Sequence, residues 1–189
     1  MPTSWRGRLV NYLLYQIGWL TCVLGAARGH PWSGAAVALI LVGAHVVLVR
    51  RRRTEIELIL CAAGIGAVAD SVQTALGIVT FRSGSLVPWL CPPWIVVLWM
   101  QFATLLRFCL SWVSGRYLLA SALGLVGGPL AFFAGARLGA ADLHPNRVLS
   151  LVSFAVVWAA ASPLLVRLAK RHGGLPGRYR WLDPHENGG

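Results

Sequence analysis

The stretch that decides the fold, residues 64–78, reads GIGAVADSVQTALGI and lies in an apolar run that nevertheless holds Asp70. The run covers about residues 56–80, which is long enough for a helix to cross the roughly 30 Å hydrocarbon core of a bilayer. Within such a helix Gly66, Asp70, Gln73 and Gly77 step by four, three and four residues. They therefore share one face. A face of small and polar side chains suits burial against other helices rather than contact with lipid.

The whole chain has the composition of an integral membrane protein. Its 189 residues are 57% hydrophobic and only 12% charged, with a mean hydropathy of +0.65, whereas a soluble domain carries about 25% charged residues. The predicted fold class is all-α, a polytopic six-transmembrane-helix bundle that forms one transmembrane domain over residues 1–168. A polar tail follows over residues 169–189 and is expected to be loosely ordered. The six predicted spans are approximately residues 9–27, 31–49, 56–80, 92–113, 117–136 and 147–168.

The basic residues predict the orientation. With six spans, both termini and the second and fourth loops share one side, which holds twelve of the seventeen basic residues, against four on the other side. Because lysine and arginine favour the cytoplasmic side, both termini are predicted to be cytoplasmic. An alternative treats the first span as a cleaved signal peptide, because arginines precede an apolar run that ends in LGAA. Asn11, Tyr15 and Gln16 within that run favour a retained span.

Several function classes are disfavoured. The net charge of +11 favours anionic phospholipid over nucleic acid as a partner, because the arginines stand between apolar runs. The four cysteines lack the clustering of a metal site or a disulfide framework, so no metal is predicted. No phosphate-binding, zinc-protease or dinucleotide-binding motif occurs, and five scattered histidines are too few for a diiron centre. The sequence thus leaves the cofactor unknown and does not decide whether the chain is an enzyme.

Depth within the spans predicts a polar pocket. At 1.5 Å per residue, Asp70 lies about 21 Å from the inner face, Gln101 about 18 Å, and the Gly127–Pro129 break in the fifth span about 15–18 Å. Because these features share one depth, we expect them to line one pocket, with the carbonyl that Pro129 leaves free facing it. The candidate ligand-binding residues are Asp70, Gln73, Gln101, Thr104, Gly127 and Gly128.

Other charged residues are assigned to the membrane surface. Arg107 lies about 12 Å from Asp70 along the membrane normal, so we expect its side chain to extend to cytoplasmic phosphates rather than pair with Asp70. His45 is expected to pair with Glu57, which opens the third span. The candidates for binding lipid headgroups are Arg107, His30 at the outer boundary, and the loop arginines Arg50, Arg51, Arg52 and Arg53.

Asp70 itself has two interpretations. It is either a hydrogen-bonded carboxyl that sets helix packing, or a functional group that contacts a ligand, carries a proton or acts as an acid–base catalyst, since ionisable residues inside membranes are costly. In the second case Asp70 is the candidate catalytic residue. A protonated Asp70 would donate a hydrogen bond to Gln101 or to a backbone carbonyl.

Four stretches together resemble a known family. They are NYLLYQIGWLTCVLGAARGHPWSG near the start, the AD that ends at Asp70, PPWIVVLWMQFATLL and LGLVGGPLAFFAGARLGA. They resemble a bacterial inner-membrane family catalogued as domain of unknown function 2878, over roughly residues 11–165. The resemblance implies a multi-pass protein of the bacterial inner membrane and, by the gene neighbourhood of the family, a role in lipid modification or photo-oxidative stress. It assigns no catalytic residue.

The leading hypothesis is therefore a small inner-membrane protein that acts in membrane-lipid modification or envelope stress and holds a lipid or small apolar ligand near Asp70. The alternatives are a proton- or cation-coupled transporter or channel, and a structural partner of a membrane enzyme. Small-residue faces such as Ala120, Gly124 and Gly128 would also allow association with another membrane protein or a homo-oligomer.

Overall fold

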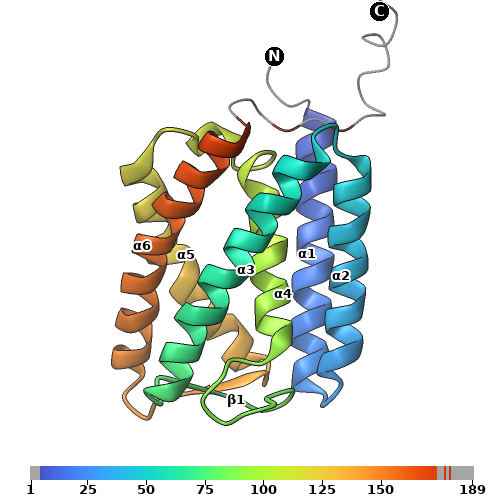
Figure 1. Cartoon of the computed structure of the whole chain (residues 1–189). Helices are drawn as coiled ribbons and strands as arrows, with labels where there is room; N and C mark the ends of the chain where they lie inside the picture. The colour runs from blue at the N-terminus through green and yellow to red at the C-terminus, as the bar shows by residue number, and fades with distance from the viewer. Residues whose placement is uncertain (1–4, 174–176, 178, 180–189) are drawn as a thin grey trace, which may run out of the picture.

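The computed structural model describes residues 5–173, 177 and 179, and these form a helical bundle with a small two-stranded sheet at one end (Figure 1). The elements in chain order are α1 (Trp5–Ala27), α2 (Pro31–Leu48), α3 (Arg52–Ala75), β1 (Val79–Phe81), α4 (Pro93–Leu106), the 3-10 turn η1 (Ser111–Val113), α5 (Tyr117–Arg137), β2 (Ala141–Leu143) and α6 (Arg147–Gly173). The all-α prediction is confirmed for the described residues.

Among the residues that the structure describes, five helices are long and apolar enough to cross a membrane: α1, α2, α3, α5 and α6. The outward faces of these helices are apolar, and Ile40, Val68 and Leu118 are 70%, 67% and 90% exposed. A surface of this kind is stable only when hydrocarbon covers it. The chain is therefore a multi-pass membrane protein.

The fourth predicted span differs from the observed helix. We expected a span over residues 92–113, but α4 has only 14 residues and ends at Leu106, where turns and η1 replace the helix. A helix of 14 residues is about 21 Å long, shorter than the hydrocarbon core. Most of α4 is buried, and α1, α2, α3 and α6 pack around it. Its ends can be irregular because they are buried in protein rather than lipid. The count of six spans stays a prediction.

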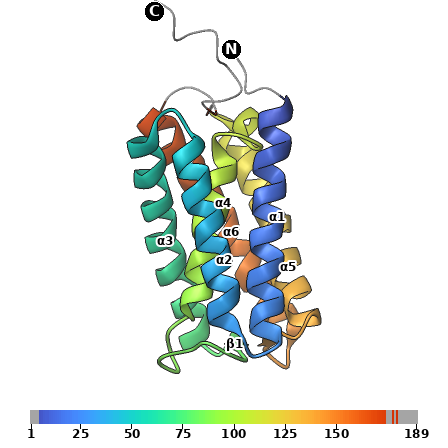
Figure 2. The same ribbon diagram turned by 90° about the vertical axis from the view of Figure 1, so that its right-hand side faces the viewer.

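Helix α4 is the centre of the bundle, between two helical hairpins. The α1–α2 hairpin lies on one side and the α5–α6 hairpin on the other, while α3 crosses α4 and also reaches α6 (Figures 1 and 2). Helix α5 packs chiefly against α6 rather than against α1 or α4. This leaves room between α1 and α5, and α4 lies at the back of that space.

The two ends of the bundle differ. The start of α1, the arginine-rich α2–α3 loop and the end of α6 lie at one end, which we call the basic end, while β1 and β2 lie at the other, the sheet end (Figure 1). The strands pair antiparallel, with Val79 opposite Leu143 and Phe81 opposite Ala141. The start of α1 and the end of α6 lie at the same end, which agrees with an even number of crossings. Which side of the membrane the basic end faces stays a prediction.

Helix α3 is shorter than the predicted third span, because strand β1 follows it. We expected helix to residue 80, but α3 stops at Ala75 because Gly77 adopts φ +68°. The amide of Ile78 then donates to the Gln73 carbonyl at 2.9 Å and that of Gly77 to the Thr74 carbonyl at 3.0 Å. This is the Schellman ending that a glycine with positive φ permits. Gly77 is therefore outside α3 and exposed, and it does not belong to the Asp70 face.

Candidate functional site

Asp70 lies in the interior of the bundle, five residues before α3 ends at Ala75, and is fully buried, with 0% exposure. Trp99 of α4 donates its indole Nε1–H to Asp70 Oδ2 at 2.7 Å. Gln73 of the same helix donates Nε2–H to Asp70 Oδ1 at 3.3 Å, and Ser153 of α6 in turn donates to Gln73 Oε1 at 3.0 Å. Every hydrogen-bond donor that the structure shows on this carboxyl is thus a neutral group. The predicted burial of Gly66, Asp70 and Gln73 on one face of α3 is confirmed.

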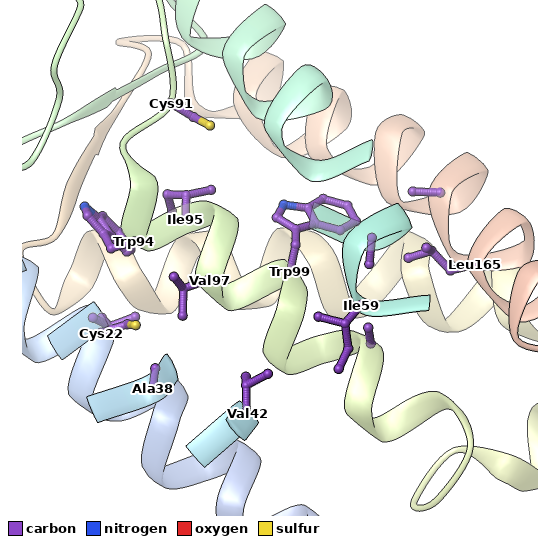
Figure 3. Packing of buried hydrophobic residues seen from close by; sticks show 14 of the residues in the cluster. Cys22, Ala38, Val42, Ile59, Cys91, Trp94, Ile95, Val97, Trp99 and Leu165 are labelled. Carbon is purple, nitrogen blue, oxygen red and sulfur yellow. The ribbon is translucent and has the colours of Figure 1, made fainter. Parts of the chain in front are cut away.

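Trp99 reaches Asp70 because glycines leave space for a stack of two indoles. A Cβ at Gly66 would overlap the Trp99 ring, and a Cβ at Gly128 of α5 would overlap Trp158 of α6. Trp99 and Trp158 stack with ring centroids 4.3 Å apart and planes 14° apart. Contacts at one level of the bundle therefore join α3, α4, α6 and α5, in the order Gly66, Trp99, Trp158 and Gly128. Figure 3 shows Trp99 and Val97 leaving α4 on different sides, Val97 toward Cys22 and Ala38.

An apolar cavity opens beside this stack. Its volume is about 70 Å³, and its walls come from α1, α3, α4, α5, α6 and the sheet. Asp70 is the one charged residue among those that line it, and most of the others are aromatic or aliphatic: they include Tyr15, Trp19, Trp94, Phe102, Phe132 and Trp158. A buried carboxyl at the wall of an apolar, aromatic cavity has the composition of a small-molecule site.

A second and larger cavity continues from the first toward the basic end. Its volume is about 270 Å³, and it shares Tyr15, Phe102, Ala131 and Trp158 with the first. Its further walls come from Gly124, Gly127 and Gly128 of α5, from Ser162 and Val166 of α6, and from residues in and next to η1. We call the two adjoining cavities the aromatic groove. It runs between α1 and α4 on one side and α5 and α6 on the other.

Gln101 and Thr104 do not belong to this groove, and the predicted contact between Gln101 and Asp70 is wrong. Gln101 donates to the Ala38 carbonyl at 2.9 Å, and its side chain packs against Gly18 of α1. Thr104 donates to the Gln101 carbonyl at 2.7 Å. Two positions on a helix are about 200° apart, so Gln101 and Trp99 face opposite sides of α4. The depth estimate therefore gave the correct level for Gln101 along the bundle, but Gln101 lies on the side of α4 that faces away from Asp70.

The glycines of the fifth span do meet the site. Gly127 and Gly128 both line the second cavity, and Gly128 abuts Trp158. Pro129 lies within α5, which continues as one helix from Tyr117 to Arg137. Of the predicted ligand-binding residues, the structure therefore places Asp70, Gly127 and Gly128 on the groove. Gln73 is behind Asp70 as its hydrogen-bond donor.

A second buried polar cluster lies at the basic end and changes the assignment of Arg107. Arg107 is 6% exposed and donates Nη1–H to Glu55 Oε2 at 2.7 Å, so it does not extend to lipid phosphates as predicted. His45 Nε2 lies 3.1 Å from Glu55 Oε1. The expected partner Glu57 instead bonds Arg53 on the exposed face of α3. Glu55 itself is 1% exposed, so this ion pair is buried.

The tail closes this cluster. Tyr179 is 1% exposed, its hydroxyl lies 3.0 Å from His45 Nδ1, and it forms an isolated bridge with Val49. Burial raises the pKa of the Tyr179 phenol above its usual range. The amide of Gly177 donates to the Arg107 carbonyl at 2.6 Å. The prediction of a loosely ordered tail is thus wrong at Gly177 and Tyr179, while the remaining residues after 173 lie outside the described part of the chain.

The other headgroup candidates are at the surface. His30 is exposed at the sheet end, with Nδ1 2.9 Å from the Arg28 carbonyl. Arg50, Arg51, Arg52 and Arg53 are exposed at the basic end, where Arg52 donates to the Val47 carbonyl at 3.0 Å. These positions agree with a headgroup role, which stays a prediction. Among the described residues, no three His, Cys, Asp or Glu side chains gather as a metal site would require.

Sequence reasoning missed Trp99, Trp158 and Glu55. The tryptophans carried a usable signal: each falls near the middle of a predicted span, although tryptophan in membrane proteins gathers at the interfaces. A mid-span tryptophan needs a hydrogen-bond partner for its N–H. Asp70 was the nearest buried acceptor in depth. Glu55 was hidden because it precedes the predicted third span and looked like a loop residue.

The fold and the site define a class: an α-helical, multi-pass membrane protein with a carboxyl group at the wall of a buried apolar groove. The family model described as Protein of unknown function (DUF2878) matches residues 8–164. The chain belongs to this family, as the resemblance of its sequence implied. Comparisons with curated proteins and with solved structures found no match.

Proposed function

We propose that this protein binds an apolar molecule of the membrane, such as a lipid chain, in the aromatic groove and acts in membrane-lipid modification or envelope stress. One observation carries the proposal: a fully buried carboxyl group, Asp70, lies at the wall of an otherwise apolar and aromatic cavity. A carboxyl at this depth is costly. Trp99 and Gln73 orient it but bring no opposite charge. It is therefore positioned as a polar group that a bound molecule would meet.

The groove also offers a route from the bilayer. It lies where α1 and α5 fail to pack on each other, and its second cavity is lined by Trp112, a half-exposed residue at the basic end. A chain from the surrounding lipid would enter sideways without crossing a polar barrier. Asp70 then stands at the inner end of that route. In an enzyme reading, Asp70 would act as the acid–base group on the part of the ligand that reaches it.

We further propose that the membrane is the inner membrane of a bacterium, with the basic end in the cytoplasm. Arg50, Arg51, Arg52 and Arg53 lie together and exposed at that end. Anionic headgroups attract such a cluster, at about 1 kcal/mol for each basic residue near the surface. Membrane phospholipid is the partner that this arrangement supports.

The test compares lipid profiles in a strain that lacks the gene and carries a plasmid copy. We expect the deletion to change the profile, wild type to restore it, and Asp70→Asn to accumulate normally but fail to restore it. Glu57→Gln is the matched control, an acid on the exposed side of the same helix. If Asp70→Asn restores the profile fully, Asp70 only packs the bundle. If the profile is unchanged by the deletion, the lipid role is wrong.

A further inference from the structure

Two buried polar atoms on α6 have no hydrogen-bond partner in the described part of the chain: the indole Nε1 of Trp158 and the hydroxyl of Ser162. The two residues are four positions apart and so lie on one helix face. Ser162 is 6% exposed. Both residues line the second, larger cavity of the aromatic groove.

Neighbouring serines do have hydrogen-bond partners, so the lack of a partner is specific to Ser162. Ser121 of α5 donates at 2.8 Å to the Ala159 carbonyl, the group that Pro163 leaves without its helical donor. Ser153 donates to Gln73. Ser162 would ordinarily bond the carbonyl of Trp158, one turn back, yet it does not. A buried hydrogen-bond donor that lacks an acceptor costs free energy. The two unpaired atoms therefore point to an acceptor that is not part of the protein.

The chemistry of that partner follows from the two groups. An indole N–H donates and cannot accept, and a hydroxyl can donate beside it. Their common complement is an acceptor oxygen with two lone pairs, such as a carbonyl. The rest of the cavity is apolar, with Phe102, Leu106 and Val166 in its walls.

We propose that Trp158 and Ser162 bind the carbonyl oxygen of an apolar membrane molecule whose skeleton lies along the aromatic groove. The inference rests on the proposed function and names the ligand class for the same groove. Glycine at positions 124 and 128 lets α5 approach these two side chains closely, because a Cβ at either position would overlap Ser162 or Trp158. Both fatty-acyl esters and isoprenoid quinones carry such an oxygen.

The experiment measures binding to the full-length, delipidated protein in detergent by native mass spectrometry. Four probes are compared: dioleoyl phosphatidylglycerol, its diether analogue with the same chains but no carbonyl, ubiquinone-10, and the hydrocarbon squalene. The variants are Ser162→Ala and Trp158→Phe. Their matched controls are Ser85→Ala in an exposed loop and Trp32→Phe on the exposed face of α2.

We expect a carbonyl-bearing probe to bind wild type, and each groove variant to weaken it about fivefold, the effect of one lost hydrogen bond. The controls and the carbonyl-free probes should not respond. The probe that responds identifies the source, an acyl ester or a quinone. Ser162→Ala should melt at the wild-type temperature or higher, because it breaks no bond within the protein.

Three results would overturn the inference. If both groove variants bind the ester and the quinone as wild type does, or if the carbonyl-free analogues bind equally well, carbonyl recognition is wrong while an apolar groove survives. If Ser162→Ala melts well below wild type, the hydroxyl is structural. If wild type binds none of the four probes, the proposed function fails together with the inference.

Discussion

Helix α3 buries two carboxyl groups, Glu55 and Asp70, and surrounds them differently. Glu55 is met by Arg107 at 2.7 Å and by His45 at 3.1 Å, with the Tyr179 hydroxyl behind the imidazole. Asp70 is met by the neutral Trp99 and Gln73. The first group has its charge compensated and closes the basic end. The second is held in place without compensation and lines a cavity.

The difference teaches how to separate structure from function among polar residues in a membrane bundle. A buried ion pair whose hydrogen bonds are all internal explains its own presence through the contacts it makes. A buried carboxyl with neutral partners and a neighbouring cavity is not explained in this way. The identity of the partners therefore distinguishes the roles of the two carboxyl groups.

The largest effect should come from exchanging the two carboxyls for amides. Glu55→Gln leaves the buried Arg107 without its carboxylate and should cost about 3–5 kcal/mol, whereas Asp70→Asn keeps an acceptor for Trp99 and should cost about 1 kcal/mol or less. Thermal unfolding in detergent and the level of protein in the membrane measure both. Equal losses for the two variants would mean that the two sites are of one kind.

The next effect concerns the glycine that admits Trp99 to Asp70. Gly66→Ala puts a methyl group into the Trp99 ring and should cost about 1–3 kcal/mol by overpacking. Gly64→Ala is its control on the same helix, since a Cβ there meets nothing within 4 Å, and it should be neutral or stabilise by up to about 1 kcal/mol. Thermal unfolding of the two variants decides, and a tolerated Gly66→Ala would show that the indole stack is loose.

Removal of one hydroxyl tests how the tail closes the Glu55 cluster. Tyr179→Phe keeps the packing on Phe108, 4.6 Å away between ring centroids, but loses the hydrogen bond to His45. It should cost about 0.5–1.5 kcal/mol, with no effect on ligand binding at Asp70. Tyr117→Phe, an exposed tyrosine at the same end, should change nothing. Protease cleavage near the C-terminus measures release of the tail.

The smallest effect belongs to an exposed pair at the sheet end, which contrasts with both buried sites. Hydrogen bonds from Arg82, at 2.6 and 2.9 Å, lower the pKa of Asp142, and Asp142 raises that of Arg82. Since the folded pKa of Asp142 is depressed, its contribution is complete above the ordinary value of about 3.9 and is lost as pH falls through the lower folded value. Both side chains are more than half exposed, so salt should screen the effect.

Amide exchange in β1 and β2 between pH 5 and 2 is the measurement for this pair. Exchange corrected for its intrinsic rate should rise only at the acid end, and Asp142→Asn should abolish the pH response. A pH response that persists in Asp142→Asn would assign it to another group.

Asp70 and Gln101 show which features of the site the sequence could predict and which it could not. The spacing of Gly66, Asp70 and Gln73 placed one face of α3 inward, because periodicity within a helix reports which side chains point the same way. Gln101 shared the depth of Asp70 but points to α1 and α2. Depth along the membrane normal says nothing about the angle around a helix axis. That angle depends on which helices surround α4.

The sequence by itself determined the membrane-spanning, all-α class, the polar face at Asp70 and the family, because apolar length, helical period and local motifs are properties of one segment at a time. Only the tertiary structure decided the partners. In it, Arg107 pairs with Glu55, Trp99 donates a hydrogen bond to Asp70, and the hydroxyl of Tyr179 in the tail contacts His45. It also brought α1 and α5 to the two sides of a groove that neither helix encodes alone. Contacts between distant segments depend on how whole helices pack, which local patterns do not specify.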